Sequence, residues 1–343
     1  MTTNALWTPM LLLGGLVALL GSVLVGFLGW RYRRRTSLSS PTLTEPPRDL
    51  SPALSGMLLA VNPNPGWKQV LATLFDLAQK GVLSFAEVPP PKSTQYKMFA
   101  LRKQPYAGAL SASEQGLLNV LFGIERTELP LSELSKVYKR QANAFTTPLR
   151  AELQAHGFLD PERQQIRQSF GRGSMVLFLL SLVGIIASLL VGSTSVIWPI
   201  VFPALGLLAV STLSFFIMLY YSPLSDRGAE AAQASHSFSD HLLAISTKAH
   251  MNVEPGLFDR YLPYATSYGL LRQWVRCFQR QEPASIPAWF THFETERAES
   301  FNAFTTVMVA AHTTGSTGSG TSSYTGTTMS GKVGGGTASK GAS

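Results

Sequence analysis

SMVLFLLSLVGIIASLLVGSTSVIWPIVFPALGLLAVSTLSFFIMLYY, residues 174–221, is the stretch that decides the fold class of this 343-residue chain. It contains 48 consecutive residues without a charged side chain, whereas about 20 apolar residues suffice for one helix to cross a bilayer. Two spans therefore fit, at about 174–192 and 197–221, with a Ser/Thr-rich turn at 193–196 between them. We expect a transmembrane helical hairpin, because a buried hairpin of a soluble domain rarely runs this far without a charge.

A further span lies near the N-terminus, where residues 8–30 carry no charged side chain. Four arginines follow it: Arg31, Arg33, Arg34 and Arg35. A secretory signal peptide has its positive charge before the apolar stretch, so this order favours an uncleaved anchor at 1–30. Because positive flanks stay in the cytoplasm, we expect a multi-pass membrane protein. Its N-terminus would lie outside, and 31–173 and 222–343 would be cytoplasmic.

Charge is scarce and unevenly distributed along the chain. Only 14% of the residues are charged, compared with about 25% in soluble domains, which excludes an ordinary soluble globule. The segment 31–173 carries 19 positive and 11 negative side chains, so anionic lipid head groups are its simplest expected partner. The predicted spans contain no Asp, Glu, Lys, Arg or His, and this argues against a pump or a coupled transporter.

Small residues recur at every fourth position in two of the predicted spans. They are Gly14, Ala18, Ser22 and Gly26 in the first span, and Gly184, Ser188 and Gly192 in the second. Small residues on one face let helix backbones approach closely in lipid, although such residues are also common in membrane helices generally. We expect the first stripe to pack against the second, or against the same face of another copy in a homo-oligomer.

The region 50–173 shows a repeated order of elements. A helix that starts after Pro65 and stops at Gly81 precedes two strands, 82–88 and 96–102, joined by a Pro-rich turn. A second set of helices, stopped by Gly157, repeats this order with a short or missing hairpin. Helix, helix, hairpin is the order of a winged-helix unit. We therefore expect a mainly α-helical membrane protein with small β-hairpin wings, in which 50–173 is a cytoplasmic tandem winged-helix-like region.

Composition divides the rest of the chain. Residues 31–49 form a linker that is first basic and then rich in Pro, Ser and Thr. Residues 222–310 show apolar and aromatic residues at helical spacing, so we expect a cytoplasmic helical region. Residues 311–343 are mostly Gly, Ser and Thr, which cannot bury a core, and they predict a disordered tail.

The sequence contains no recognisable catalytic, cofactor-binding or metal-binding set of residues. The six histidines are scattered, and no carboxylate pair completes a metal site. Cys277 is the only cysteine, which excludes an internal disulfide framework. A single cysteine on a helix is most often a buried core residue, and we expect this for Cys277. No phosphate-binding glycine loop precedes a helix, and no Gly-x-Ser-x-Gly motif is present. We expect a protein that is not an enzyme and needs no cofactor.

Three stretches of the chain resemble the YciQ-like family of predicted bacterial membrane proteins, whose C-terminal region is a domain of unknown function. They are LSPALSGMLLAVNPNPGWKQVLATLFDLAQKGVLSF (50–85), PLSDRG (223–228) and LFDRYLPYATSYGLLRQW (257–274). Typical members carry an N-terminal extracytoplasmic domain. Here seven residues precede the first span, so we expect that domain to be missing. The resemblance implies a location in the inner membrane of a bacterium. It implies no known activity and no catalytic residues.

Three functions remain open from the sequence. The leading hypothesis is a non-enzymatic scaffold or interaction protein whose cytoplasmic modules bind an unknown protein partner. The alternative is a membrane-tethered nucleic-acid-binding regulator, because the second helix of a winged-helix unit can bind in the major groove of DNA. Its candidate contacts are Lys136, Lys139, Arg140 and Arg150. An enzyme or transporter whose site the sequence does not reveal is a third possibility.

Overall fold

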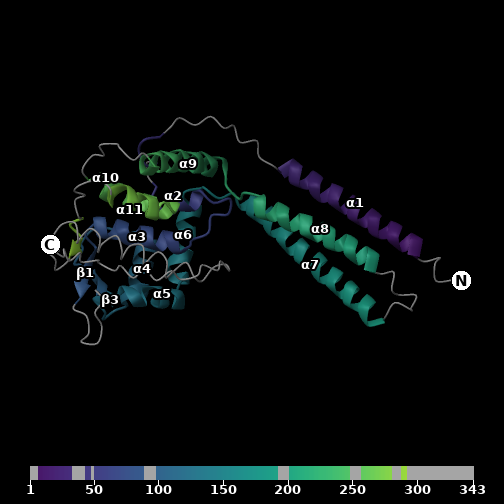
Figure 1. Cartoon of the computed structure of the whole chain (residues 1–343), viewed down its shortest axis with the longest axis horizontal. Helices are drawn as coiled ribbons and strands as arrows, with labels where there is room; N and C mark the ends of the chain where they lie inside the picture. Colours follow the sequence, from purple (N-terminus) through teal and green to yellow (C-terminus); the bar gives the residue numbers. More distant parts are fainter. Residues whose placement is uncertain are drawn as a thin grey trace, which may run out of the picture.

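The computed structural model describes residues 7–32, 43–47, 50–88, 98–191, 201–247, 256–279 and 287–291. Three long helices extend to one side of a globular domain (Figure 1). The domain is built from two segments of the chain, one before and one after the predicted hairpin. The expected turn at 193–196 and the expected tail at 311–343 lie outside the described residues.

The three long helices are α1 (Trp7–Tyr32), α7 (Pro161–Val191) and α8 (Val201–Tyr220). Each contains a window that is long and apolar enough to cross a membrane, as the sequence predicts. The helix α7 begins 13 residues before the expected start of its span at 174, because the polar segment 161–173 is helical as well. The additional turns carry α7 out of the apolar region towards the globular domain.

The helix α8 lies between α1 and α7 (Figure 1). Serine hydroxyls link it to α7: Ser181 Oγ donates to the carbonyl of Ala204 and Ser211 Oγ donates to the carbonyl of Ser174, both at 2.8 Å. These serines are buried between the helices. Hydrogen bonds and close backbone approach hold helices together in lipid, because apolar side chains gain little by exchanging contacts with lipid for contacts with one another.

The domain contains eight helices in the described part of the chain. They are α2 (Pro52–Leu58), α3 (Trp67–Gln79), α4 (Ala112–Phe122), α5 (Leu131–Arg140), α6 (Asn143–Ala155), α9 (Asp226–Thr247), α10 (Leu257–Tyr268) and α11 (Leu271–Gln279). Local signals set several of their ends. Gly81 has a φ of 77° just after α3, and the amide of Val82 bonds to the carbonyl of Leu77 at 2.9 Å, which is a glycine-dependent helix stop.

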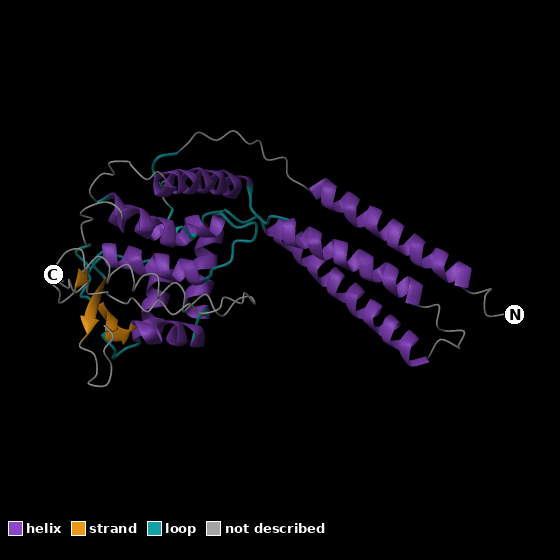
Figure 2. Ribbon diagram, viewed as in Figure 1, coloured by secondary structure: helices purple, strands orange, loops and turns teal. Residues whose placement is uncertain are grey.

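A small sheet, drawn in orange in Figure 2, covers one end of the domain. Its strands are β1 (Leu83–Val88), β2 (Met98–Lys103), β3 (Glu128–Pro130) and β4 (Phe290–Thr291), in the order β3-β2-β1-β4. The predicted hairpin is present, because β1 and β2 pair antiparallel from Leu83 opposite Lys103. The edge strands β3 and β4 were not predicted, and each lies far in sequence from the strand that it pairs with.

One hydrophobic core runs through the whole domain. The helix α10 packs on α2 and α3, and α9 packs on α2, so residues after the hairpin cover residues before it. Phe75, Phe85, Phe238 and Trp274 are each less than 2% exposed within this shared core. The described parts of the regions 50–173 and 222–310, which the sequence analysis treats separately, therefore contribute to one shared core.

The structure does not support winged-helix modules. A recognition helix must keep one face free to enter a DNA groove, but nine of the 13 residues of α3 are buried. The second set of helices has no hairpin of its own in the described residues, because its strand β3 pairs with β2 of the first set. The repeated order of elements thus builds one sheet and one core.

The chain leaves and re-enters the domain at a single place. Leu159 and Leu224 form an antiparallel bridge. Beside it, the amide of Asp160 donates to the carbonyl of Pro223 at 3.0 Å, and the amide of Ser225 donates to the carbonyl of Phe158 at 2.9 Å. Both ends of the α7–α8 hairpin therefore meet beside the globular domain.

Candidate functional site

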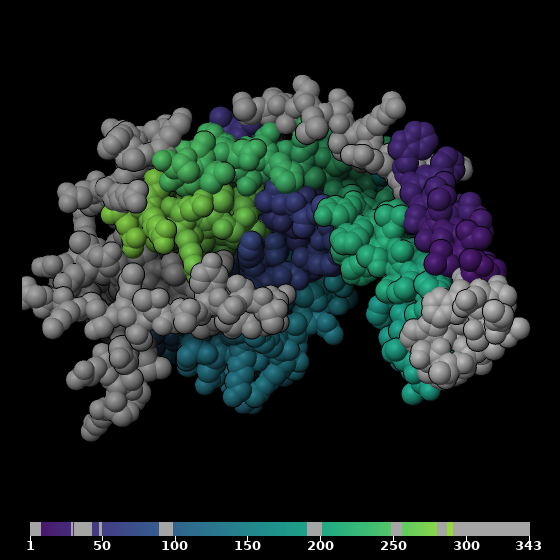
Figure 3. All heavy atoms as spheres, turned by 45° about the vertical axis from the view of Figure 1, so that its right-hand side comes forward, coloured from purple at the N-terminus to yellow at the C-terminus, as the bar shows by residue number. Residues whose placement is uncertain are grey.

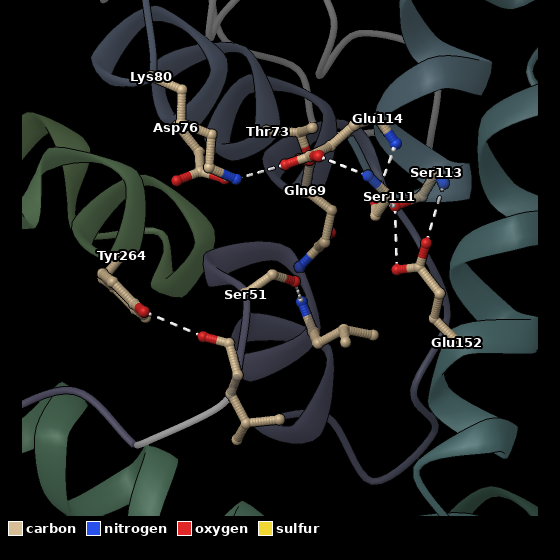
Figure 4. Close-up of polar contacts among 12 residues, drawn as sticks. Ser51, Gln69, Thr73, Asp76, Lys80, Ser111, Ser113, Glu114, Glu152 and Tyr264 are labelled. Carbon is tan, nitrogen blue, oxygen red and sulfur yellow. Dashed lines mark hydrogen bonds and ion pairs between the residues drawn. The ribbon is translucent and has the colours of Figure 1, made fainter. Parts of the chain in front are cut away.

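A polar network joins α3 to α4 (Figure 4). Lys80, which follows the last residue of α3, places its Nζ 2.7 Å from Asp76 Oδ2 and 2.6 Å from Glu114 Oε1. The Glu114 side chain is only 8% exposed, so a single lysine compensates two carboxylates that are largely removed from water. A buried carboxylate needs such a partner because an unpaired buried charge is strongly unfavourable.

The N-terminus of α4 forms the second half of this network. Ser111 Oγ accepts a hydrogen bond from the amide of Glu114 at 3.2 Å, and Glu114 Oε2 accepts one from the amide of Ser111 at 2.8 Å. This is a reciprocal capping box. Glu152, on α6, accepts hydrogen bonds from the amide and the hydroxyl of Ser113 at 2.9 and 3.0 Å. Carboxylates are stabilised at a helix N-terminus, so both glutamates have a structural role here.

Burial controls the protonation of this network. Burial raises the pKa of Asp76, the hydrogen bond and charge of Lys80 lower it in part, and the Glu114 carboxylate raises it slightly again. Burial by itself would lower the pKa of Lys80, but its hydrogen bonds to Asp76 and Glu114 outweigh that effect and raise it. Lys80 is therefore a cation at neutral pH, and a protonated amine is not a nucleophile.

The network has no space for a substrate. The cleft beside it, whose walls include Ser51, Thr73 and Ser111, encloses about 10 Å³, roughly the room that one water molecule needs. The described residues also contain no group of three or more His, Cys, Asp or Glu side chains that could hold a metal ion. The arrangement fixes α3, α4 and α6 relative to one another and does not resemble a reaction centre.

A second buried polar cluster joins α2 to the half of the domain that follows the hairpin. Ser55 Oγ lies 2.6 Å from Tyr268 Oη and 2.9 Å from Ser235 Oγ. Burial raises the pKa of Tyr268 far above its usual value, so the phenol stays protonated. Gly56 is needed beside this cluster because a Cβ there would lie 1.7 Å from Ser267 Oγ. These hydrogen bonds hold α2 against α9 and α10, while the buried Ser267 Oγ has no hydrogen-bond partner among the described residues.

A larger cavity lies where α7 and α8 meet the domain. Its volume is about 390 Å³, within the range of about 300–1,000 Å³ that is usual for small-molecule sites. Its walls come from the segment 62–64, from α6, from the first half of α7 and from the end of α8. In Figure 3 an open notch separates the domain from the long helices beside their point of contact. We call this cavity the junction pocket.

The polar side chains of the junction pocket are arginines and amides. They are Asn62, Asn64, Arg150, Gln154, Gln164, Arg167 and Gln168, and no carboxylate is among the lining residues. Arg150 Nη2 donates to Asn64 Oδ1 at 2.8 Å. Arg167 Nε donates to the carbonyl of Met218 at 3.0 Å, and its Nη1 donates to the side chain of Asn62. Both guanidinium groups are thus held in place by neutral oxygen atoms.

The profile of one protein family matches residues 31–278, and that family is described as the C-terminal domain of the predicted membrane protein DUF2207. The match covers more than half of the chain. The chain belongs to this family. The resemblance to YciQ-like membrane proteins is thereby confirmed, and the family description together with the three apolar helices supports a membrane location. No curated protein and no solved structure gave a significant match.

In this DUF2207 chain the first small-residue stripe faces α8. A Cβ on Gly14 would lie 2.5 Å from the carbonyl oxygen of Phe202, and a Cβ on Gly206 would lie 2.5 Å from that of Gly14. Ala18 and Ser22 are half-buried, whereas a Cβ on Gly26 would meet no atom within 4 Å. Within the chain, the stripe therefore packs on the third span, not on the second span as the sequence suggested.

Helix geometry explains why the stripe does not stay in contact. Four residues turn an α-helix by about 400°, so a stripe with this spacing drifts by about 40° at each step. After three steps Gly26 points about 120° away from Gly14. Gly21, seven residues after Gly14, returns to the contact face, and a Cβ there would lie 2.5 Å from Val210 Cγ2. The seven-residue spacing Gly14–Gly21 was the signal that the sequence analysis missed.

The other predicted residues of this DUF2207 member are placed as follows. Gly184 faces α8, where its Cβ would lie 2.9 Å from the Cβ of Ala204, and Ser188 is buried with its hydroxyl donating to the carbonyl of Gly184. Arg31 lies in the last turn of α1, while Arg33, Arg34, Arg35 and Gly192 lie outside the described residues. Cys277 is buried, as expected. No motif in the sequence predicted the junction pocket, whose walls come from the segment 62–64 and from α6, α7 and α8.

Proposed function

We propose that this chain is a non-enzymatic interaction protein of the bacterial inner membrane whose cytoplasmic domain docks another protein through α5. The supporting observation is the outward face of this helix. Lys136, Lys139 and Arg140 are exposed there, while Leu134 and Tyr138 on the opposite face are buried. Among the described residues, none of these three cations has a carboxylate oxygen within 4.0 Å. An unpaired cationic face suits an acidic protein surface.

The proposed orientation rests on charge. The two ends of the α7–α8 hairpin meet at the Leu159–Leu224 bridge, so all parts of the domain share one side of the membrane. Arg167 and Arg172 lie at that end of α7, and four arginines follow the apolar part of α1. Since positive flanks favour the cytoplasm, we place the domain there and the N-terminus outside.

Nucleic acid is the competing partner for the same cations. Lys136, Lys139 and Arg140 remain exposed, but the fourth residue of that hypothesis, Arg150, turns to Asn64 beside the junction pocket. The loss of the winged-helix arrangement removes the geometry by which a helix would enter a groove. A protein partner is therefore the better-supported proposal.

Photo-crosslinking in living cells tests this proposal. A photoreactive residue at Ser132 stands on the outward face of α5 and keeps all three cations, and the same residue at exposed Glu230 on α9 is the control. We expect a protein adduct from position 132 that is lost when Lys136, Lys139 and Arg140 are all replaced by Gln, and no such adduct from position 230. A nuclease-sensitive adduct would support the alternative. An adduct that survives the triple substitution, or none at all, would refute docking through α5.

A further inference from the structure

We propose that the junction pocket binds a phosphate-bearing anion, with Arg150 and Arg167 as its cationic ligands. This inference does not depend on a protein partner. It concerns a different surface from α5 and rests on the lining, the depth and the volume of the pocket.

The charge of the pocket is not compensated within the described residues. Two other arginines face carboxylates: Arg102 Nε lies 3.1 Å from Glu128 Oε2, and Arg163 Nε lies 3.3 Å from Asp160 Oδ2. Arg150 and Arg167 are instead held by amide and carbonyl oxygens, which orient a guanidinium but do not neutralise it. Two oriented cations in one cavity without an acidic residue in its walls form a site for an anion.

The donor arrangement fits a phosphate group. A guanidinium has five N–H donors, and its planar fork matches two phosphate oxygens. The named hydrogen bonds use two donors of Arg167 and one of Arg150, so each retains donors for a ligand. The amide groups of Gln154 and Gln168 also line the pocket and can donate to the remaining oxygens.

The depth of the pocket matches the head-group layer. Arg167 precedes Arg172, the last charged residue before the apolar part of α7, by five residues, which is about 8 Å along a helix. Met218, on the opposite wall, lies in the last turn of α8. Each polar layer of a bilayer is about 5–8 Å thick beyond the hydrocarbon core. Basic pockets between helices at this level bind anionic lipid head groups, and a soluble phosphate ester would present the same chemistry.

The test uses the full chain purified in detergent. Binding of dioleoyl phosphatidylglycerol and of dioleoyl phosphatidylcholine is measured by native mass spectrometry, and binding of glycerol 3-phosphate by calorimetry. The first variant is Arg150→Gln, because Arg150 is exposed and its loss leaves the fold intact. The second is Arg150→Gln with Arg167→Gln. The control, Lys139→Gln with Arg140→Gln, removes the same charge as the second variant but from α5.

We expect phosphatidylglycerol to bind more tightly than phosphatidylcholine and Arg150→Gln to weaken that binding about tenfold, the usual worth of one charge-assisted hydrogen bond. The double pocket variant should lose more, and the α5 control should match the wild type. Arginine-dependent binding of glycerol 3-phosphate at a similar affinity would assign the site to a soluble phosphate ester and would equally support it. Binding that Arg150→Gln leaves unchanged, or that the α5 control weakens as much, would overturn the proposal, as would no binding in any arm.

Discussion

Lys80 is the residue whose loss should most disturb the polar network. Replacing Lys80 with Met leaves Asp76 and Glu114 without their shared cation, while both carboxylates remain largely shielded from water. Removing one partner of a buried charged hydrogen bond costs about 1–3 kcal/mol, and because Lys80 is 40% exposed we expect about 1–2 kcal/mol here. The readout is the unfolding midpoint of the domain by near-ultraviolet circular dichroism. Lys103→Met, at an exposed position on β2, should have little effect, and equal losses would contradict a special role for Lys80.

Asp259 predicts a dependence of stability on pH. Burial raises the pKa of Asp259, while hydrogen bonds from Trp289 and Gln79 lower it in part; Trp289 Nε1 donates to Asp259 Oδ1 at 3.0 Å. A carboxyl with a raised folded-state pKa binds its proton more readily in the folded than in the unfolded chain, so its contribution to stability falls as pH rises from the unfolded to the folded pKa. The contribution of Asp259 to stability is therefore low at neutral pH.

Asp259→Asn keeps the acceptor for Trp289 and removes the half-buried charge. The variant should therefore be more stable than the wild type at neutral pH, and the advantage should shrink as pH falls through the raised pKa of Asp259. Thermal unfolding of both chains from neutral pH to about pH 4 measures this. A difference that grows on acidification would mean that the carboxylate, not the carboxylic acid, is the favoured form in the folded protein.

At the scale of elements, α1 packs on α8 through a close backbone approach at Gly14. Gly14→Leu would place side-chain atoms where the Phe202 carbonyl lies, whereas a Cβ on the adjacent Gly15 would meet no atom within 4 Å. Both substitutions add the same apolar volume, which lipid accepts. We expect Gly14→Leu to separate α1 from α8 and to lower the unfolding temperature in detergent, and Gly15→Leu to leave it unchanged.

A cysteine pair tests the same contact directly. In a chain with Cys277 replaced by Ala, cysteines at positions 21 and 210 would have Cβ atoms about 3.4 Å apart, close to the 3.5–4.5 Å of a disulfide. Oxidation should link them, and Gly14→Leu should reduce the yield. A pair at positions 18 and 188, which would report packing of α1 on α7, should link poorly because α8 lies between these helices. Efficient linkage of that pair would overturn this arrangement of α8.

The elements that the sequence predicts well are those with local signals. The ends of α3 and α6 follow from Gly81 and Gly157, because in each case a glycine with a positive φ lies two residues after the last helical residue. The strands β3 and β4 have three and two residues and exist only by pairing with β2 and β1. No periodicity in such short segments reveals a partner that is distant in sequence.

At the scale of the whole molecule, the sequence could not show that the spans interrupt one domain. Composition marks 174–221 as apolar and both flanks as mixed, which is equally compatible with one shared core or with two separate domains. The contacts of α10 with α2 and α3 decide the matter. The junction pocket was unpredictable for the same reason: Asn62, Arg150 and Arg167 have no recognisable spacing, and only the shared core brings them together.

If the domain has one core, its two halves should fold together without the membrane helices. Asp160 and Pro223 are already joined by a hydrogen bond of 3.0 Å beside the Leu159–Leu224 bridge, so a two-residue Asn-Gly turn, the preferred connection of an antiparallel pair, can replace 161–222. We expect a chain of residues 50–160, Asn-Gly and 223–310 to be soluble and monomeric, with a cooperative thermal transition.

Residues 50–160 alone should not behave in this way, because the faces of α2 and α3 that α9 and α10 cover would be exposed to water. Circular dichroism melts and size-exclusion chromatography of the two chains provide the comparison. Equally sharp unfolding of the shorter chain would show that the first half is a domain in its own right, as the sequence first suggested, and that the shared core adds little to its stability.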